Sequence, residues 1–135
     1  MAPAHESIEA GLAGDCDDFA ILMASLIEAI GGKTRVILAW GPKGGHAYAE
    51  VYVGNENDVQ RLIDWISNYS DEYGRLRKKL YRWLLGENYT FHYHKEGSGE
   101  CWLNLDWTAE HPGGKFFTSY RAIAVYPDGN FKKIQ

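Results

Sequence analysis

Apolar residues recur at helical spacing early in the chain. Between residues 17 and 30 they occupy every third or fourth position, and two glycines follow directly. This spacing predicts an amphipathic helix that ends at Gly31. Asp15 is the expected N-cap, which puts Cys16 at or just inside the first helical turn. The apolar positions are Phe19, Leu22, Met23, Leu26, Ile27 and Ile30.

The segments after this helix have the β-branched or alternating composition of strands. Residues 34–40 (TRVILAW) and 46–53 (HAYAEVYV) are the first two, and residues 41–45 (GPKGG) between them predict a hairpin with a five-residue loop. Further strands are predicted at residues 89–94, 101–107 and 119–127. The chain therefore combines an early helix with several short strands.

Residues 55–99 form a long excursion between the predicted strands, with helical pieces at 59–66 and 72–85. Residues 73–83 combine a cationic face, which has no acidic residue, with an apolar stripe. This segment could dock an acidic partner or substrate, or it could be an ordinary helix with a solvated face. The cations are Arg75, Arg77, Lys78, Lys79 and Arg82, and the apolar residues are Tyr73, Leu76, Leu80, Trp83 and Leu84.

Composition and charge exclude several classes of function. A chain of 135 residues with 45% hydrophobic residues can bury a sizeable core. No apolar run approaches the ~20 residues that span a bilayer, and no secretory signal is present, so we expect no membrane contact and a cytoplasmic location by default. The net charge is −4, with −6 in residues 1–60 and +2 in residues 61–135, which argues against nucleic acid as a partner. The oligomeric state stays open.

Cys16 is the first candidate for chemistry. A helix N-terminus offers free N–H groups and a partial positive charge, which stabilise the nucleophilic thiolate. The adjacent Asp15, Asp17 and Asp18 oppose a thiolate unless they cap the helix or meet cations. Alternatively, Cys16 is only a small buried apolar residue. The second cysteine, Cys101, lies in a predicted strand, and no disulfide between the two is expected.

A thiol nucleophile needs a base and a group that orients the base. His46 opens one predicted strand and Asp106 closes another, so antiparallel pairing would bring them together. Setting the two opposite each other also places Val51 opposite Cys101. One face is then apolar (Ala47, Ala49, Val51, Leu103 and Leu105) and the other polar (His46, Tyr48, Glu50, Asn104 and Asp106). Each polar residue alone could be merely solvated, so the interpretation depends on the trio.

Three blocks of the chain resemble the transglutaminase-like domain. They are GDCDDFAILMASLIEAIG at residues 14–31, GGHAYAEVYV at 44–53 and WLNLDWT at 102–108, in the family's order of Cys, His and Asp. The resemblance implies an α+β, papain-like fold in which the cysteine helix packs on an antiparallel β-sheet. It also implies one domain over residues 1–135, from which upstream helices could be missing, with a helical insertion at about residues 55–99 between the His and Asp strands.

The resemblance further implies that Cys16 is the nucleophile, His46 the general base and Asp106 the residue that orients His46. Trp107 stands where the family more often has proline, which affects only the turn after the strand. The backbone N–H of Cys16 is the natural first oxyanion donor, and a second donor is not assigned.

Such a triad supports acyl transfer through a thioester. With water as acceptor the protein would be a peptidase or amidase, which the resemblance to microbial members favours. With an amine as acceptor it would be a protein-crosslinking transglutaminase. We expect a peptide or protein substrate and no cofactor. The remaining alternative is a non-catalytic binding module that keeps the fold.

His92 and His94 alternate on one face of a predicted strand, a spacing that can bind zinc, and Cys101 is a conceivable third ligand. No second close pair of ligands completes a set of four. We therefore predict structural roles for both histidines and no metal site.

Overall fold

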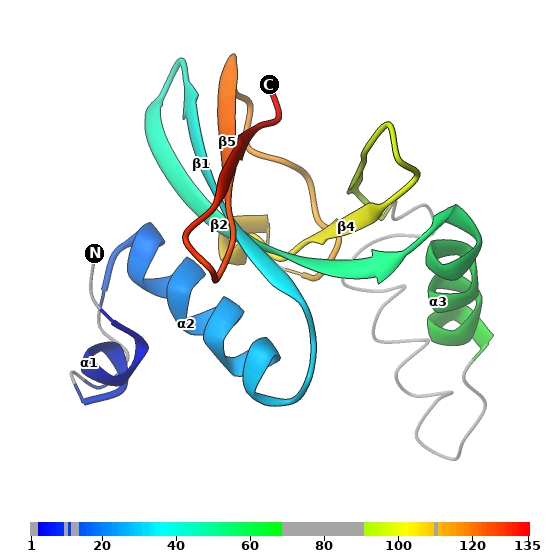
Figure 1. The fold of residues 1–135 in the computed structure, drawn as a ribbon, viewed down its shortest axis with the longest axis horizontal. Helices are drawn as coiled ribbons and strands as arrows, with labels where there is room; N and C mark the ends of the chain where they lie inside the picture. Colours follow the sequence, from blue (N-terminus) through cyan, green and yellow to red (C-terminus); the bar gives the residue numbers. More distant parts are fainter. Residues whose placement is uncertain (1–2, 10, 12–13, 69–90, 110) are drawn as a thin grey trace.

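The computed structural model describes residues 3–9, 11, 14–68, 91–109 and 111–135. These residues form an α+β fold, as expected, in which helices lie beside a curled antiparallel sheet of strand order β3-β4-β2-β1-β5-β6 (Figure 1). The helices are α1 (Ala4–Glu9), α2 (Cys16–Ala29), α3 (Glu56–Asn68) and the 3-10 helix η1 (Trp107–Ala109). The strands are β1 (Thr34–Gly41), β2 (Gly44–Gly54), β3 (Tyr93–Lys95), β4 (Cys101–Asn104), β5 (Arg121–Val125) and β6 (Phe131–Lys133).

Helix α2 begins and ends where the sequence predicts. Asp15 is its N-cap, and the Asp15 N–H donates to Asp18 Oδ2 at 3.3 Å, one half of a capping box. At the other end Gly31 has a φ of 90°, a left-handed conformation that glycine adopts without strain. The Gly31 N–H donates to the Glu28 carbonyl at 3.0 Å and satisfies one of the last carbonyls of the helix. These local signals make Cys16 the first helical residue.

Strands β1 and β2 form a tighter hairpin than predicted. Gly41 pairs with Gly44, so the turn contains only Pro42 and Lys43 instead of five residues. Gly44 has a φ of 105°, which lets the chain reverse direction within two residues. The paired strands therefore extend further toward the turn, and His46 lies inside β2 rather than at its start.

The pairing of β2 with β4 is antiparallel, as predicted, but the predicted register is wrong by two residues. A shift of two residues leaves every side chain on the same face, so the alternation of apolar and polar residues could not detect it. A bulge between Tyr52 and Gly54 shifts the last pair by one further residue, so that Gly54 rather than Val51 lies opposite Cys101. The observed pairs are Glu50–Asn104, Val51–Leu103, Tyr52–Trp102 and Gly54–Cys101.

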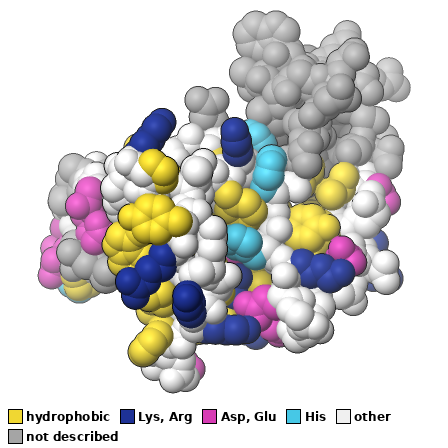
Figure 2. Space-filling model, turned by 90° about the horizontal axis from the view of Figure 1, so that it is seen from above, with side chains coloured by type: hydrophobic (Ala, Val, Ile, Leu, Met, Phe, Trp, Pro, Cys, Tyr) yellow, Lys and Arg dark blue, Asp and Glu magenta, His cyan; other side chains and the backbone are white. Residues whose placement is uncertain are grey.

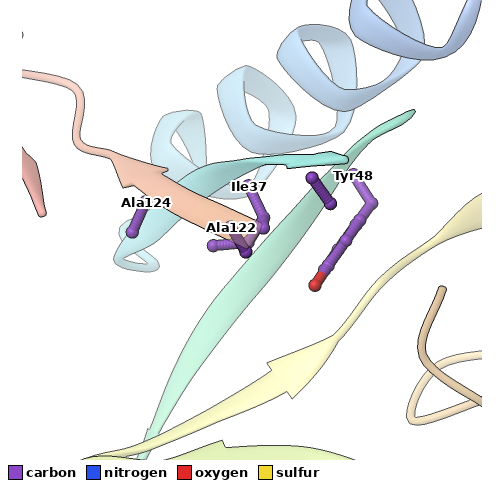
Figure 3. Packing of buried hydrophobic residues seen from close by; sticks show 5 residues of the cluster. Ile37, Tyr48, Ala122 and Ala124 are labelled. Atoms are coloured by element: carbon purple, nitrogen blue, oxygen red, sulfur yellow. The ribbon is translucent and has the colours of Figure 1, made fainter. Parts of the chain in front are cut away.

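Different parts of the chain pack on the two faces of the sheet. Helix α2 packs on β2 and β1, where the small buried side chains of Ala47 and Ala49 alternate along β2. The opposite face holds an apolar cluster contributed by β1, β2 and β5 (Figure 3). Phe116 and Phe117, from the segment before β5, pack against this cluster. Its buried members are Ile37, Ala39, Tyr48, Ala122 and Ala124.

The remaining predictions for secondary structure are met in part. The helix expected at residues 59–66 is the longer α3, and the strand expected at 89–94 is observed as β3, after Tyr89 and Thr90, which lie outside the described residues. Strands β4 and β5 are shorter than predicted. The predicted basic helix at 72–85 lies outside the described residues. In the part of the chain that is described, no helix is long and apolar enough to cross a membrane.

Candidate active site

His46 and Asp106 lie in hydrogen-bond contact, as the sequence predicts. His46 Nε2 is 2.8 Å from Asp106 Oδ2, and the two side chains are only 10% and 1% exposed. His46 comes from β2, and Asp106 follows the end of β4, which pairs with β2. On the face of the molecule seen in Figure 2, histidine side chains reach the surface between apolar ones. Neighbouring strands thus hold the pair in a largely water-shielded position.

This hydrogen bond determines which ring nitrogen of His46 is available for chemistry. A carboxylate only accepts hydrogen bonds, so Nε2 carries a hydrogen and donates a hydrogen bond to Asp106. In the neutral ring Nδ1 is then an acceptor, which is the state a general base requires. The Phe117 ring packs against His46 with a centroid separation of 4.9 Å and restricts movement of the imidazole.

Three further hydrogen bonds hold Asp106. Its Oδ1 accepts the backbone N–H of Thr108 at 3.0 Å and the Thr108 hydroxyl at 2.8 Å. Its backbone N–H donates to Asn104 Oδ1 at 3.0 Å, and the Asn104 side-chain amide donates to the Gly114 carbonyl at 2.8 Å. The sequence prediction missed these contacts of Thr108 and Asn104, although both residues belong to the WLNLDWT block.

Cys16 is the first residue of α2 and is half-buried. The first hydrogen bond of the helical ladder runs from the Phe19 N–H to the Asp15 carbonyl at 3.1 Å, so the Cys16 N–H lies ahead of that ladder. Backbone N–H groups in this position and the helix dipole favour a negative charge. The location suits either a thiolate or the oxyanion formed when a thiolate attacks a carbonyl group.

The neighbouring aspartates have the opposite electrostatic effect. Carboxylate oxygens of Asp15, Asp17 and Asp18 lie within 4.8 Å of one another. A side-chain hydrogen bond between Asp15 and Asp17 raises the pKa of Asp15 and lowers the pKa of Asp17. The N-terminal turn of α2 therefore carries a cluster of acidic side chains as well as free N–H groups.

An aromatic contact links the first turn of α2 to the strand end that carries Asp106. The rings of Phe19 and Trp107 are tilted by 31° with centroids 5.3 Å apart. Phe19 lies one turn after Cys16, and Trp107 directly follows Asp106. Among the residues that the structure describes, no hydrogen bond joins the Cys16 thiol to His46 or Asp106. The structure thus pairs His46 with Asp106 and ties the helical turn of Cys16 to the same strand end.

A second histidine–carboxylate pair lies further along the same face of β2. Glu50 is fully buried and binds both His94 Nδ1 and, at 2.7 Å, Arg35 Nε. Arg35 also donates to Glu96, and its guanidinium lies 4.2 Å from the ring centre of Trp102. This network was not predicted, although Arg35 and Glu50 stand out as charged residues within otherwise apolar strand segments.

The other residues considered for metal binding or thiol chemistry make structural contacts. The His92 ring donates from Nδ1 to the Gly113 carbonyl at 3.2 Å, and His94 binds Glu50. Cys101 is fully buried, and burial raises the pKa of its thiol. A raised pKa lowers the fraction of the reactive thiolate at Cys101.

Comparison with models of known protein families gives a match. A family model described as the transglutaminase-like superfamily matches residues 1–109. The matched range contains Cys16, His46 and Asp106 and covers most of the 135 residues. No curated protein and no solved structure gives a significant match.

Proposed function

The chain belongs to the transglutaminase-like superfamily, and from this premise we propose that it is a thiol-dependent acyl-transfer enzyme. Cys16 is the proposed nucleophile, His46 the general base and Asp106 the residue that orients the base. The hydrogen bond between His46 Nε2 and Asp106 Oδ2 is the observation that carries the proposal, because it leaves Nδ1 free to accept a proton.

In the proposed reaction His46 Nδ1 accepts the thiol proton while Cys16 Sγ attacks the carbonyl carbon of an amide. Breaking the C–N bond transfers that proton from His46 to the leaving amine and leaves an acyl group bound to Cys16 as a thioester. A water molecule then attacks the thioester, with His46 again accepting a proton. The carboxylic acid leaves and the Cys16 thiol takes the proton back. Asp106 stabilises the imidazolium ion in both halves of the reaction.

The backbone N–H of Cys16 supports this chemistry from the helix side. It lies ahead of the hydrogen-bonded ladder of α2, where it can donate to the oxygen that becomes negative in the tetrahedral intermediate. The same end of the helix favours the attacking thiolate. Electrostatic stabilisation of this kind is worth the most where water is excluded, and His46 and Asp106 are largely buried.

We propose water as the acceptor, so that the protein is a peptidase or amidase with a peptide or protein substrate. Half-burial of Cys16 leaves room for water to reach a thioester. Use of an amine instead would make the protein a crosslinking transglutaminase, which requires a site that excludes water and admits lysine. A binding module that only keeps the fold is the alternative from another class, and it would not need a reactive thiol.

A trapping experiment on a library of peptide amides tests the proposal. We expect amide cleavage with a transient acyl adduct on Cys16, seen by mass spectrometry of the acid-quenched protein and removed by hydroxylamine. Cys16→Ala should abolish cleavage, whereas the matched variant Cys101→Ala should keep it because Cys101 is buried away from solvent. Transfer of the acyl group to added lysine analogues in preference to water would favour the transglutaminase. Cleavage that persists in Cys16→Ala would contradict the proposed mechanism.

A further inference from the structure

The carboxylate of Asp106 both binds His46 and caps a short helix. Its Oδ2 faces His46, while Oδ1 caps the short helix η1 by accepting the backbone N–H of Thr108 at 3.0 Å. The turn is closed by the Ala109 N–H, which donates to the Asp106 carbonyl at 3.0 Å. A backbone cap of this kind would hold the helix whatever residue occupied position 108.

The side chain of Thr108 adds something that the cap does not require. Its hydroxyl donates a second hydrogen bond to Oδ1, at 2.8 Å. Rotation of a carboxylate about its last bond is soft, so a single donor leaves the angle of the carboxylate plane loosely fixed. With two donors on Oδ1, any tilt of the carboxylate plane strains two hydrogen bonds, which keeps Oδ2 directed at His46 Nε2.

Asn104 holds Asp106 from the backbone side. It is fully buried, and its Oδ1 accepts the Asp106 N–H at 3.0 Å. Its Nδ2 donates to Gly114 at the start of the segment that brings Phe117 against the His46 ring. Asn104 thus fixes both the backbone of Asp106 and the segment that carries Phe117 to His46. These contacts leave the rotation of the Asp106 carboxylate unrestricted.

We propose that Thr108 is a positioning residue of the acyl-transfer reaction. Its hydroxyl fixes the orientation of the Asp106 carboxylate plane and keeps one oxygen in line with His46 Nε2, and so it holds His46 in the tautomer with a proton on Nε2 and an acceptor at Nδ1. This inference rests on the proposed function for its catalytic consequence, but the link from Thr108 to the tautomer is a property of the resting protein. Thr108 touches neither the thiol nor the reacting carbonyl, so it acts only through Asp106.

Thr108 is well placed for a clean substitution because its side chain is exposed, unlike that of Asn104. Thr108→Val has nearly the same shape and removes the hydroxyl donor while the backbone cap stays. Thr108→Ser keeps the hydroxyl and loses only a methyl group. The two variants separate the loss of the hydrogen bond from any change in packing around η1.

The test uses the full chain and two readouts. Nitrogen-15 NMR of the imidazole reports the His46 tautomer without any substrate, and amide cleavage measured against pH reports the base in action. We expect Thr108→Val to mix the second tautomer into the His46 signal, to lower kcat roughly tenfold with little change in KM, and to shift the pH profile. Thr108→Ser should restore all three. A purely structural contact would alter the melting temperature but leave tautomer and pH profile unchanged.

Each outcome decides the inference. A tautomer and pH profile unchanged in Thr108→Val, or changed equally in Thr108→Ser, would overturn it. If the wild-type protein cleaves no amide, the proposed function fails, and the NMR measurement then decides the positioning role alone. A redistributed tautomer would support that role, and an unchanged one would overturn it.

Discussion

Two histidine–carboxylate pairs lie on the same face of β2, and they differ in how the carboxylate is neutralised. Glu50 gives one oxygen to His94 and the other to Arg35, whose Nε is 2.7 Å away. Asp106 gives one oxygen to His46, at 2.8 Å, and the other to the neutral donors of Thr108. The first carboxylate has a permanent cation beside it, whereas among the described residues His46 is the only ionisable group that hydrogen-bonds to the second.

This difference separates a structural pair from one suited to catalysis. The Arg35 guanidinium binds Glu50 and Glu96 and packs on Trp102, so these groups surround one buried cation. Burial opposes that charge, but the charge of Glu50 and the hydrogen bond that Arg35 donates to Glu96 outweigh it and raise the pKa of Arg35. An imidazolium at His94 would thus meet a carboxylate that Arg35 already satisfies. At His46 the charge of Asp106 remains available to stabilise an imidazolium ion.

Breaking the His46–Asp106 pair should have the largest effect on activity. Asp106→Asn keeps the size of the side chain but lets His46 adopt the wrong tautomer, so we expect kcat to fall about 10⁴-fold with the fold preserved. The matched variant on the other pair, His94→Gln, should leave kcat within about twofold, since Glu50 keeps Arg35. Turnover by the purified variants and their circular dichroism measure both effects. Equal losses of kcat in the two variants would contradict the distinction between a catalytic and a structural pair.

Breaking the network around Arg35 should instead lower the stability of the fold. Arg35→Met leaves the buried Glu50 without its cation, while Glu96 keeps Lys132, so we expect a loss of about 3–5 kcal/mol in the free energy of urea unfolding. Arg121→Met is the matched control, because Arg121 also lies over a tryptophan ring, Trp40, at 5.1 Å but is exposed. It should cost less than about 1 kcal/mol. Similar losses in the two variants would show that the buried charges do not matter.

The dependence of the unfolding free energy on acidic pH should reveal a smaller contribution from Glu96. Burial opposes its charge, yet hydrogen bonds from Lys132 and Arg35 outweigh burial and lower the pKa of Glu96. Its contribution is therefore fully present above the usual glutamate value of about 4.3 and is lost as the pH falls through the lower, folded value. Between pH 6 and pH 3, Glu96→Gln should lose less stability than the wild type in urea titrations. Parallel curves for the two proteins would contradict this assignment.

Local signals in the sequence were sufficient for the cysteine helix. Asp15 as N-cap and Gly31 after the last turn act within a few residues, so the ends of α2 and the place of Cys16 follow directly. The alternation along β2 similarly predicted that His46 and Asp106 share a face, since side-chain direction in a strand has a period of two residues.

Contacts between distant segments could not be predicted in the same way. The register of β2 against β4 depends on the tight turn at Pro42 and Lys43 and on the bulge before Gly54, which alternation does not encode. The partners of Glu50 come from β1 and β3, far apart in the sequence. The hydrogen bond from Thr108 to Asp106 joins residues only two positions apart in the sequence. Its proposed role depends on His46, which lies 60 residues before Asp106.

The central claim is that Cys16 is a reactive thiol served by His46, and selective alkylation tests it without a substrate. At pH 6 we expect iodoacetamide to label native Cys16 at least ten times faster than a free cysteine, while buried Cys101 remains unlabelled. The charges of the nearby aspartates oppose this, but at 0.1 M salt exposed charges are screened over about 10 Å, whereas in the proposed ion pair the His46 imidazolium would lie next to the thiolate. His46→Ala should remove the advantage. Labelling of Cys16 no faster than a free thiol, and indifferent to His46→Ala, would contradict the claim.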